Sequence, residues 1–260
     1  MPLVVNVVGR GRSTGKTSII EQITRKLSEK NFQVASIKHI STETFDTPNK
    51  DTWRHLKAGA KSVVAITSGE IIHIKTIEKP NLTEALEVID EGVDIVLVEG
   101  FKDSAYPKII VGEKRSDVND LLPNLENVFA ISGRVSSDQY EMDKIAGDVP
   151  ILKIEELLPL IEEMIIVETI KKLPGLNCKL CGYDSCMEMG KAILRGVASI
   201  DDCETLANTD VKLMIDDIRI NLSPFPRDFI KNVIIGMVKS LKGVEIDNVN
   251  VIELKINLHN

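Results

Sequence analysis

The chain has 260 residues, of which 43% are hydrophobic and 27% charged, and its formal net charge is −7 at pH 7. This length suits one large core plus a smaller second unit, and the acidic balance argues against a broad basic face for nucleic acid or anionic lipid. The sequence begins with a strand-like run instead of a basic leader, and no apolar stretch reaches the roughly 20 residues that a membrane helix needs. We therefore expect a cytoplasmic protein with no nucleic-acid or membrane partner.

The first 30 residues predict a strand, a loop and a helix in that order. Residues 3–8 are almost wholly apolar, as in a parallel strand buried on both faces. Residues 18–30 place four apolar side chains at helical spacing with charged residues between them. The loop between these two elements carries three glycines and leads directly into the helix. Such a loop presents backbone N–H groups and the helix dipole to a phosphate.

The loop sequence predicts a site for a nucleoside triphosphate. Lys16 supplies a positive charge for the β/γ-phosphates, and Thr17 supplies a hydroxyl ligand for Mg²⁺. The usual pattern has four residues between its glycines, whereas five separate Gly9 from Gly15, so Arg10 stands where the first glycine is expected. The alternative is a chance Gly-Lys-Thr in a surface turn, against which the preceding strand and the following helix argue. The predicted phosphate-binding residues in the loop are Arg10, Gly11, Arg12, Ser13, Thr14, Gly15, Lys16 and Thr17.

The following residues, up to about 150, alternate strand-like and helical or loop segments. Strands are predicted at residues 34–37, 62–66, 71–75, 94–98, 108–111 and 127–131, with a helical or loop segment at 82–90 and a polar surface loop at 41–50. The alternation implies an α/β fold of the P-loop NTPase type, with a mainly parallel sheet and helices on both faces.

Glu99 follows the apolar run 94–98 at the predicted end of a strand. Ligands of open α/β sheets bind at this edge, so Glu99 is the candidate carboxylate near the metal or the attacking water. Together with Lys16 it forms the predicted catalytic pair. The alternative is an ordinary solvated glutamate at the end of a strand.

The sequence changes character after residue 151. Residues 155–173 predict a helix that ends at Pro174-Gly175, a breaker pair. We therefore predict two domains, a nucleotide-binding domain at 1–168 and a small cysteine-rich α+β domain at 169–260. In the second domain, strands are predicted at 212–220 and 249–257 and a helix at 227–241.

All four cysteines lie in one short segment, at Cys178, Cys181, Cys186 and Cys203. Clustered thiols in a reducing compartment indicate metal ligands or redox groups, and a helix over residues 186–197 would bring the fourth cysteine back to the first three. All-cysteine ligation fits a [4Fe-4S] cluster or a structural zinc. We favour the cluster because zinc ribbons usually have two Cys-x-x-Cys knuckles and this segment has one. Free thiols are the third alternative.

The cysteine segment also resembles a known type of domain. Leu173-Pro174-Gly175 and Cys181-Gly182-Tyr183, followed by a helix, resemble the four-cysteine iron-sulfur domain of certain electron-transfer subunits and corrinoid proteins. Those proteins are found in anaerobes, and this resemblance implies an anaerobic source.

Three sequence blocks of the first domain resemble the molybdopterin-guanine dinucleotide biosynthesis adaptor proteins, the MobB family. The first is the phosphate loop, the second runs from Ile37-Lys38-His39 to Ala58-Gly59-Ala60, and the third is Val98-Glu99-Gly100-Phe101-Lys102 with Pro107-Lys108. The combination is specific, because a generic NTPase shares only the first block. The resemblance covers about the first 165 residues.

The resemblance implies a GTP-binding protein, at most a slow GTPase, that assists the attachment of a guanine nucleotide to molybdopterin. It implies a homodimer, with the cofactor nucleotidyltransferase, molybdopterin or a molybdoenzyme as partners. ATP stays an alternative, because the sequence has no clear Asn-Lys-x-Asp guanine signature. By resemblance, Gly15, Lys16, Thr17 and Ser18 bind phosphate and Mg²⁺, Glu99 acts near the metal or water, and Asp46, Lys50 and Arg54 line the site. His39, His55 and Arg54 are candidate contacts for a pterin phosphate, or ordinary surface residues.

Two other classes of function stay open beside the adaptor. One is an electron donor that is gated by a nucleoside triphosphate, in which the cluster reduces an acceptor. The other is a carrier that delivers a metal or a cluster through its cysteines.

Overall fold

The computed structural model describes residues 1–11, 13–40, 49–79, 81–137, 148–207, 210–215, 218–243 and 249–256. The chain divides into two compact units, Met1–Glu168 and Thr169–Asn260, and helix α6 (Ile154–Ile170) runs across this boundary in the sequence. Among the described residues, no helix is both long and apolar enough to cross a membrane.

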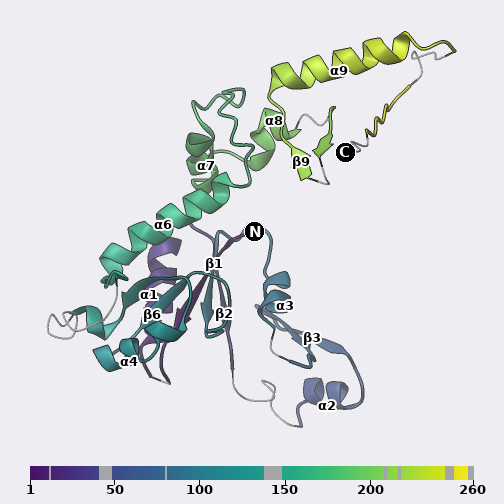
Figure 1. Ribbon diagram of the computed structural model, residues 1–260. Coiled ribbons are helices and arrows are strands. Elements are labelled where there is room, and N and C mark those ends of the chain that lie inside the picture. Colours follow the sequence, from purple (N-terminus) through teal and green to yellow (C-terminus); the bar gives the residue numbers. More distant parts are fainter. Residues whose placement is uncertain are drawn as a thin grey trace. The chain divides into compact units, whose positions relative to one another are not determined.

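The first unit is built on a parallel sheet (Figure 1). Its described strands are β1 (Leu3–Val8), β2 (Val34–Lys38), β5 (Ile95–Glu99), β6 (Lys108–Val111) and β7 (Val128–Ser132), in the spatial order β2-β5-β1-β6-β7. All four neighbouring pairs are parallel. The central strand β1 is buried along its whole length, as its apolar sequence predicts for a strand covered on both faces.

One face of the sheet packs against helices that follow β4 and β6 in the chain. Val4 of β1 lies in a cluster with Leu82 of α3 (Leu82–Glu87), and Val8 lies in a cluster with Val118 of α4 (Arg115–Asn119). Short 3-10 turns, η1 (Leu122–Asn124) and η2 (Arg134–Ser137), flank β7 in the chain. Side chains alternate along a strand, so this face takes the even-numbered residues of β1.

Helix α1 (Lys16–Ser28) covers the opposite face. It contacts β1, β2 and β5, and Thr17 donates a hydrogen bond to Glu99, whose register partner is the odd-numbered Val7. Lys30, just after α1, pairs with Glu162 of α6. The predicted mainly parallel sheet with helices on both faces is therefore confirmed.

The strands predicted at 62–66 and 71–75 form at those residues but lie outside the main sheet. β3 (Ser62–Ile66) and β4 (Ile71–Lys75) pair with each other as an antiparallel hairpin, which α2 (Asp51–Lys57) precedes in the chain. Ile66 and Ile71, at the end of the hairpin, are about three-quarters exposed, at 76% and 74%. Both segments are strand-like in sequence, but only the structure shows which strands they pair with.

The second unit has its own small core. Leu173 packs in one buried cluster with Cys203 and with Cys186 and Met189, the last two from α7 (Cys186–Leu194). The 3-10 turn η3 (Ile200–Asp202) and α8 (Glu204–Ala207) flank the last cysteine.

Two predictions for the C-terminal residues are wrong. The single strand expected at 212–220 is instead two strands, because β8 (Leu213–Ile215) pairs antiparallel with β9 (Ile218–Ile220). Residues 249–256 form no strand, although their apolar and polar residues alternate. Alternation fits a strand but does not make one, since a strand also needs a partner for its backbone groups. The last helix, α9 (Pro224–Lys239), begins earlier than predicted because proline at its first position favours a helix start.

Candidate functional site

The loop between β1 and α1 is packed tightly at its first glycine. A Cβ on Gly9 would lie 2.5 Å from Oγ1 of Thr14 and 2.9 Å from the carbonyl oxygen of Val111. Gly9 is therefore the glycine that allows the loop backbone to pack closely against its neighbours. The loop from Gly9 to Gly15 is one residue longer than the usual pattern. Arg10, which stands at the expected glycine position, pairs through its guanidinium with Asp120.

Helix α1 begins without a side-chain cap. Its N-cap residue is Gly15, with a φ of 84° in the left-handed region, and its first turn has no acidic residue. The first N–H groups of a helix lack partners within the helix, and its N-terminus carries partial positive charge. This end of α1 is therefore suited to an anion.

Lys16 folds back over the loop that precedes it. Its ammonium donates hydrogen bonds to the carbonyl of Gly11 at 2.6 Å and to Oγ1 of Thr14 at 3.1 Å. Burial lowers the pKa of Lys16, Glu99 opposes this effect, and the positive charges of Lys102 and Lys38 lower the pKa further. Two other ammonium groups thus act on Lys16, and Glu99 is the carboxylate that opposes their effect.

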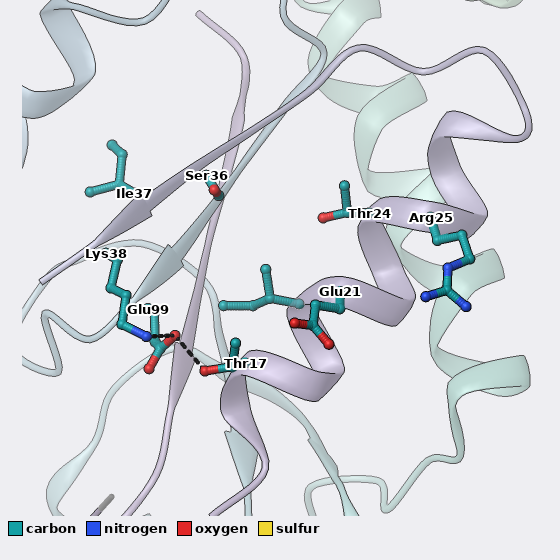
Figure 2. Close-up of a pocket in the computed structure, with 9 residues that line it drawn as sticks. Thr17, Glu21, Thr24, Arg25, Ser36, Ile37, Lys38 and Glu99 are labelled. Carbon is teal, nitrogen blue, oxygen red and sulfur yellow. Dashed lines mark hydrogen bonds and ion pairs between the residues drawn. The ribbon is translucent and has the colours of Figure 1, made fainter. Parts of the chain in front are cut away.

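Glu99 lies at the end of β5 and joins α1 to β2. One of its oxygens, Oε2, accepts a hydrogen bond from Oγ1 of Thr17 at 3.0 Å and forms an ion pair with Nζ of Lys38 at 3.2 Å, as Figure 2 shows. Lys38 and Glu99 are register partners at the carboxyl ends of neighbouring parallel strands. The predicted magnesium ligand and the predicted catalytic carboxylate are therefore in direct contact.

Two cavities meet at this contact. The larger, of about 620 Å³, follows the phosphate loop, and the smaller, of about 450 Å³, runs between α1 and β2. Thr17, Lys38 and Glu99 line both of them. The larger cavity is also lined by Gly11, Ser13, Thr14, Gly15, Lys16, His39 and Ile40.

Several predicted site residues lie elsewhere. Arg10, Ser18, Lys50 and Arg54 are not among the residues that line the two cavities. Lys50 is the N-cap residue of α2, and Arg54 of the same helix, which also carries His55, pairs with Asp51 at 3.5 Å. Arg12 and Asp46, with the rest of the predicted surface loop up to residue 48, fall outside the described residues.

Lys38 is a site residue that the sequence pattern does not single out, beyond its place in the block Ile37-Lys38-His39. The rule that ligands bind at the carboxyl edge of parallel strands applies to β2 as well as to β5 and is the signal that points to it. His39, a candidate contact for a pterin phosphate, lines the larger cavity and lies against Phe101, with ring centroids 5.0 Å apart.

The loop that follows Glu99 is held by two buried polar residues. The side-chain amide of Asn6, in the middle of β1, donates hydrogen bonds to the carbonyls of Gly100 and Phe101 at 2.8 and 3.2 Å. Oδ1 of Asn6 accepts a hydrogen bond from Oγ of Ser104 at 2.9 Å. The ammonium of Lys108, which is 1% exposed, donates to the carbonyls of Ser104, Tyr106 and Glu126. The loop over residues 100–106 is thereby tied to β1 and β6.

Three of the four cysteines of the second unit contribute to its core. Cys186 and Cys203 are buried there, and Cys181 packs against them. The thiol of Cys178 lies 3.3 Å from Oγ1 of Thr205. Burial raises the pKa of Cys178, but the hydrogen bonds from Thr205 and from the backbone of Leu180 outweigh it, so the pKa lies below its ordinary value.

This donor set fits a thiolate-bound metal centre in its chemistry. It contains four sulfur ligands, and Gly182, with a φ of 83°, lets the backbone turn between the second and third of them. Within the described part of the chain, no three potential ligands already surround a common metal position. The residue types thus suit such a centre.

Comparison with known proteins gives a match to each unit. The family model described as "Molybdopterin guanine dinucleotide synthesis protein B" matches residues 4–134, and the model described as "Putative Fe-S cluster" matches residues 173–204, which contain all four cysteines. A solved structure of Bacillus subtilis MobB, 25% identical, covers 65% of this chain and 98% of its own, with a TM-score of 0.49.

Two curated relatives carry related names. The "Putative molybdopterin-guanine dinucleotide biosynthesis adapter protein" of Methanocaldococcus jannaschii is 30% identical over 98% of this chain and 97% of its own length. The "Probable molybdopterin-guanine dinucleotide biosynthesis adapter protein" of Bacillus subtilis is 32% identical over 53% of this chain and 80% of its own. The first relative spans both units, and the first family model covers half of the chain. The chain therefore belongs to the family of molybdopterin guanine dinucleotide synthesis protein B.

Proposed function

We propose that the first unit binds GTP with Mg²⁺ and that the protein acts as an adaptor in the synthesis of molybdopterin guanine dinucleotide. The arrangement of Lys16, Thr17 and Glu99 around one cavity of about 620 Å³ is the observation that carries the proposal. Family membership supports the pathway. The preference for guanine rests on the family alone, so ATP has to be tested beside GTP.

The proposed roles follow from the chemistry of each group. The N–H groups at the start of α1 and the ammonium of Lys16 bind phosphate oxygens. Thr17 and Glu99 would hold Mg²⁺, which screens the phosphate charge when it is bound. The side chain of Lys16 would exchange its contacts with Gly11 and Thr14, which line the same cavity, for contacts with phosphate.

The second unit is proposed to hold a [4Fe-4S] cluster through Cys178, Cys181, Cys186 and Cys203. A cluster of this type supplies one-electron redox chemistry when it is bound. The match of residues 173–204 to an iron-sulfur family supports this assignment, and zinc is the alternative that fits the same ligands. Metal and sulfide analysis of protein purified without oxygen distinguishes the two.

As partners, we propose the nucleotidyltransferase that makes the dinucleotide, with molybdopterin or a molybdoenzyme on the receiving side. A second copy of the chain, in a homodimer, is proposed on the same ground. These partners follow from the pathway in which the relatives are named.

Replacement of Lys16 by alanine tests the nucleotide site. We expect the affinity for a fluorescent GTP analogue to fall roughly a hundredfold, because a charged hydrogen-bond donor contributes about 1.5–3 kcal/mol and the phosphates lose their nearest cation. Circular dichroism should be unchanged, since among the described residues the ammonium bonds to the loop and not to the sheet. Lys26→Ala is the control, because Lys26 lies on the same helix and pairs with Glu29. An unchanged titration of Lys16→Ala would refute the proposal, and competition with unlabelled ATP and GTP decides the base.

A further inference from the structure

The ammonium of Lys38 contacts one of the predicted magnesium ligands. Its ammonium lies 3.2 Å from the same Glu99 oxygen that accepts the hydroxyl of Thr17. Its side chain is 56% exposed, whereas that of Glu99 is 16% exposed. Lys38 thus supplies the positive charge that balances a half-buried carboxylate, and it reaches this position from solvent.

The contact with Lys38 occupies the group that a divalent cation needs. At equal distance, a divalent ion is attracted to a carboxylate twice as strongly as an ammonium group is. Hard cations such as Mg²⁺ also prefer oxygen ligands like those of Thr17 and Glu99. A metal ion that phosphates also bind would therefore displace the ammonium of Lys38 from Glu99.

The position of Lys38 gives the displaced ammonium another contact. Lys38 is the last residue of β2, which lies at one edge of the described sheet, and it lines the phosphate cavity as well as the groove between α1 and β2. Thr17 and Lys38 line both cavities, and the phosphate loop with Lys16 lines the larger one. A terminal phosphate bound beside Thr17 would therefore share a cavity with the Lys38 side chain.

We propose that Lys38 is an exchangeable counter-ion that pairs with Glu99 in the nucleotide-free protein and with the terminal phosphate of a bound nucleoside triphosphate. This inference rests on the proposed nucleotide site. A triphosphate carries more negative charge than a diphosphate, so Lys16 alone neutralises a smaller fraction of the charge of a triphosphate. Lys38 thereby selects the triphosphate over the diphosphate.

The first test measures metal binding without nucleotide, with Mn²⁺ titrated into the full-length protein and followed by electron paramagnetic resonance. We expect Lys38→Ala to bind Mn²⁺ several-fold more tightly than the wild type, because the competing ammonium is gone. Lys38→Arg keeps the charge and should stay near the wild type. Lys26→Ala is the matched control, since the side chain of Lys26 is 55% exposed and pairs with a different glutamate.

The second test measures GTP and GDP affinity by calorimetry in the presence of Mg²⁺. We expect Lys38→Ala to weaken GTP binding roughly tenfold and to leave GDP binding nearly unchanged, because one charged contact to the terminal phosphate is lost. The two tests therefore predict shifts of opposite sign in one variant. A purely structural role of Lys38 would weaken both metal and nucleotide binding.

The outcomes separate the inference from the function on which it rests. If the wild type binds GTP and Lys38→Ala has an unchanged ratio of GTP to GDP affinity, Lys38 is not a counter-ion of the terminal phosphate and the proposed function stands. Weaker Mn²⁺ binding by Lys38→Ala would likewise overturn the competition for Glu99. A wild-type protein that binds neither GTP nor ATP would overturn both proposals.

Discussion

Gly9 shows how single residues set the shape of the phosphate loop. The sequence predicts the core Gly15-Lys16-Thr17 from its residue types and from its place between a strand and a helix. It does not show which glycine packs against the sheet, because that depends on the carbonyl of Val111, a residue of β6 far away in the sequence. The position of Lys38 beside Glu99 was missed for a similar reason, since it follows from the pairing of β2 with β5.

We predict that Gly9→Ala weakens GTP binding and destabilises the protein by about 1–3 kcal/mol, the usual effect of overpacking. The added Cβ would collide with a backbone oxygen of Val111, which cannot move without moving β6. Gly69→Ala is the control, because a Cβ there meets no atom within 4 Å and Gly69 lines neither cavity. Chemical denaturation and GTP titration of both variants check this prediction, and equal behaviour of the two would contradict it.

At the scale of elements, segments were easier to predict than their pairing. Runs such as residues 3–8 and 108–111 lie where apolar sequence predicts buried strands, because both faces are covered. The hairpin of β3 and β4 has the same local signal, but no local property reveals that it pairs outside the main sheet. Residues 249–256 also have a strand-like pattern, but they form no strand because they have no neighbouring strand with which to pair among the described residues.

The loop over residues 100–106 depends on Lys108, so we predict that Lys108→Met lowers the free energy of unfolding by about 3 kcal/mol. The apolar side chain would leave three backbone carbonyls without their donor. Burial lowers the pKa of Lys108, with Glu126 and Asp103 opposing it, so the folded state holds the proton less firmly than the unfolded state. The wild type should therefore gain stability as the pH rises through the lowered pKa, and the methionine variant should lack this gain.

Urea denaturation at neutral and alkaline pH, followed by circular dichroism, measures both effects. Lys61→Met, at an exposed position, is the control and should unfold like the wild type. A Lys108→Met protein as stable as this control would show that water or neighbouring groups replace the lost donor.

At the scale of the whole molecule, the two units have separate cores. The sheet with α1 and α6 belongs to the first, and the cluster of Leu173, Met189 and three of the cysteines belongs to the second. The sequence indicates a change of character near residue 170 through a breaker pair and a cysteine segment. The sequence does not reveal how the cysteine side chains would be arranged around a metal, because the arrangement of the ligands depends on the metal itself.

We predict that Cys181→Ala loses bound iron and the brown absorbance expected near 400 nm but keeps the GTP affinity of the wild type. Separate cores give the nucleotide site no direct dependence on the cysteine ligands. The measurement is iron and sulfide analysis, visible absorbance and GTP titration on the same anaerobic preparation. Zinc in place of iron in the wild type would contradict the cluster, and loss of GTP binding in the variant would show that the units fold as one.

The ties from Asn6 and Lys108 to residues 100–106 have a consequence for binding thermodynamics. A recognition loop that is ordered only by its ligand sacrifices conformational entropy at each binding event. Here strand side chains have already restricted the backbone next to Glu99. A nucleotide that docks beside Glu99 should therefore bind with a small heat-capacity change and fast association, as expected of a pre-organised surface.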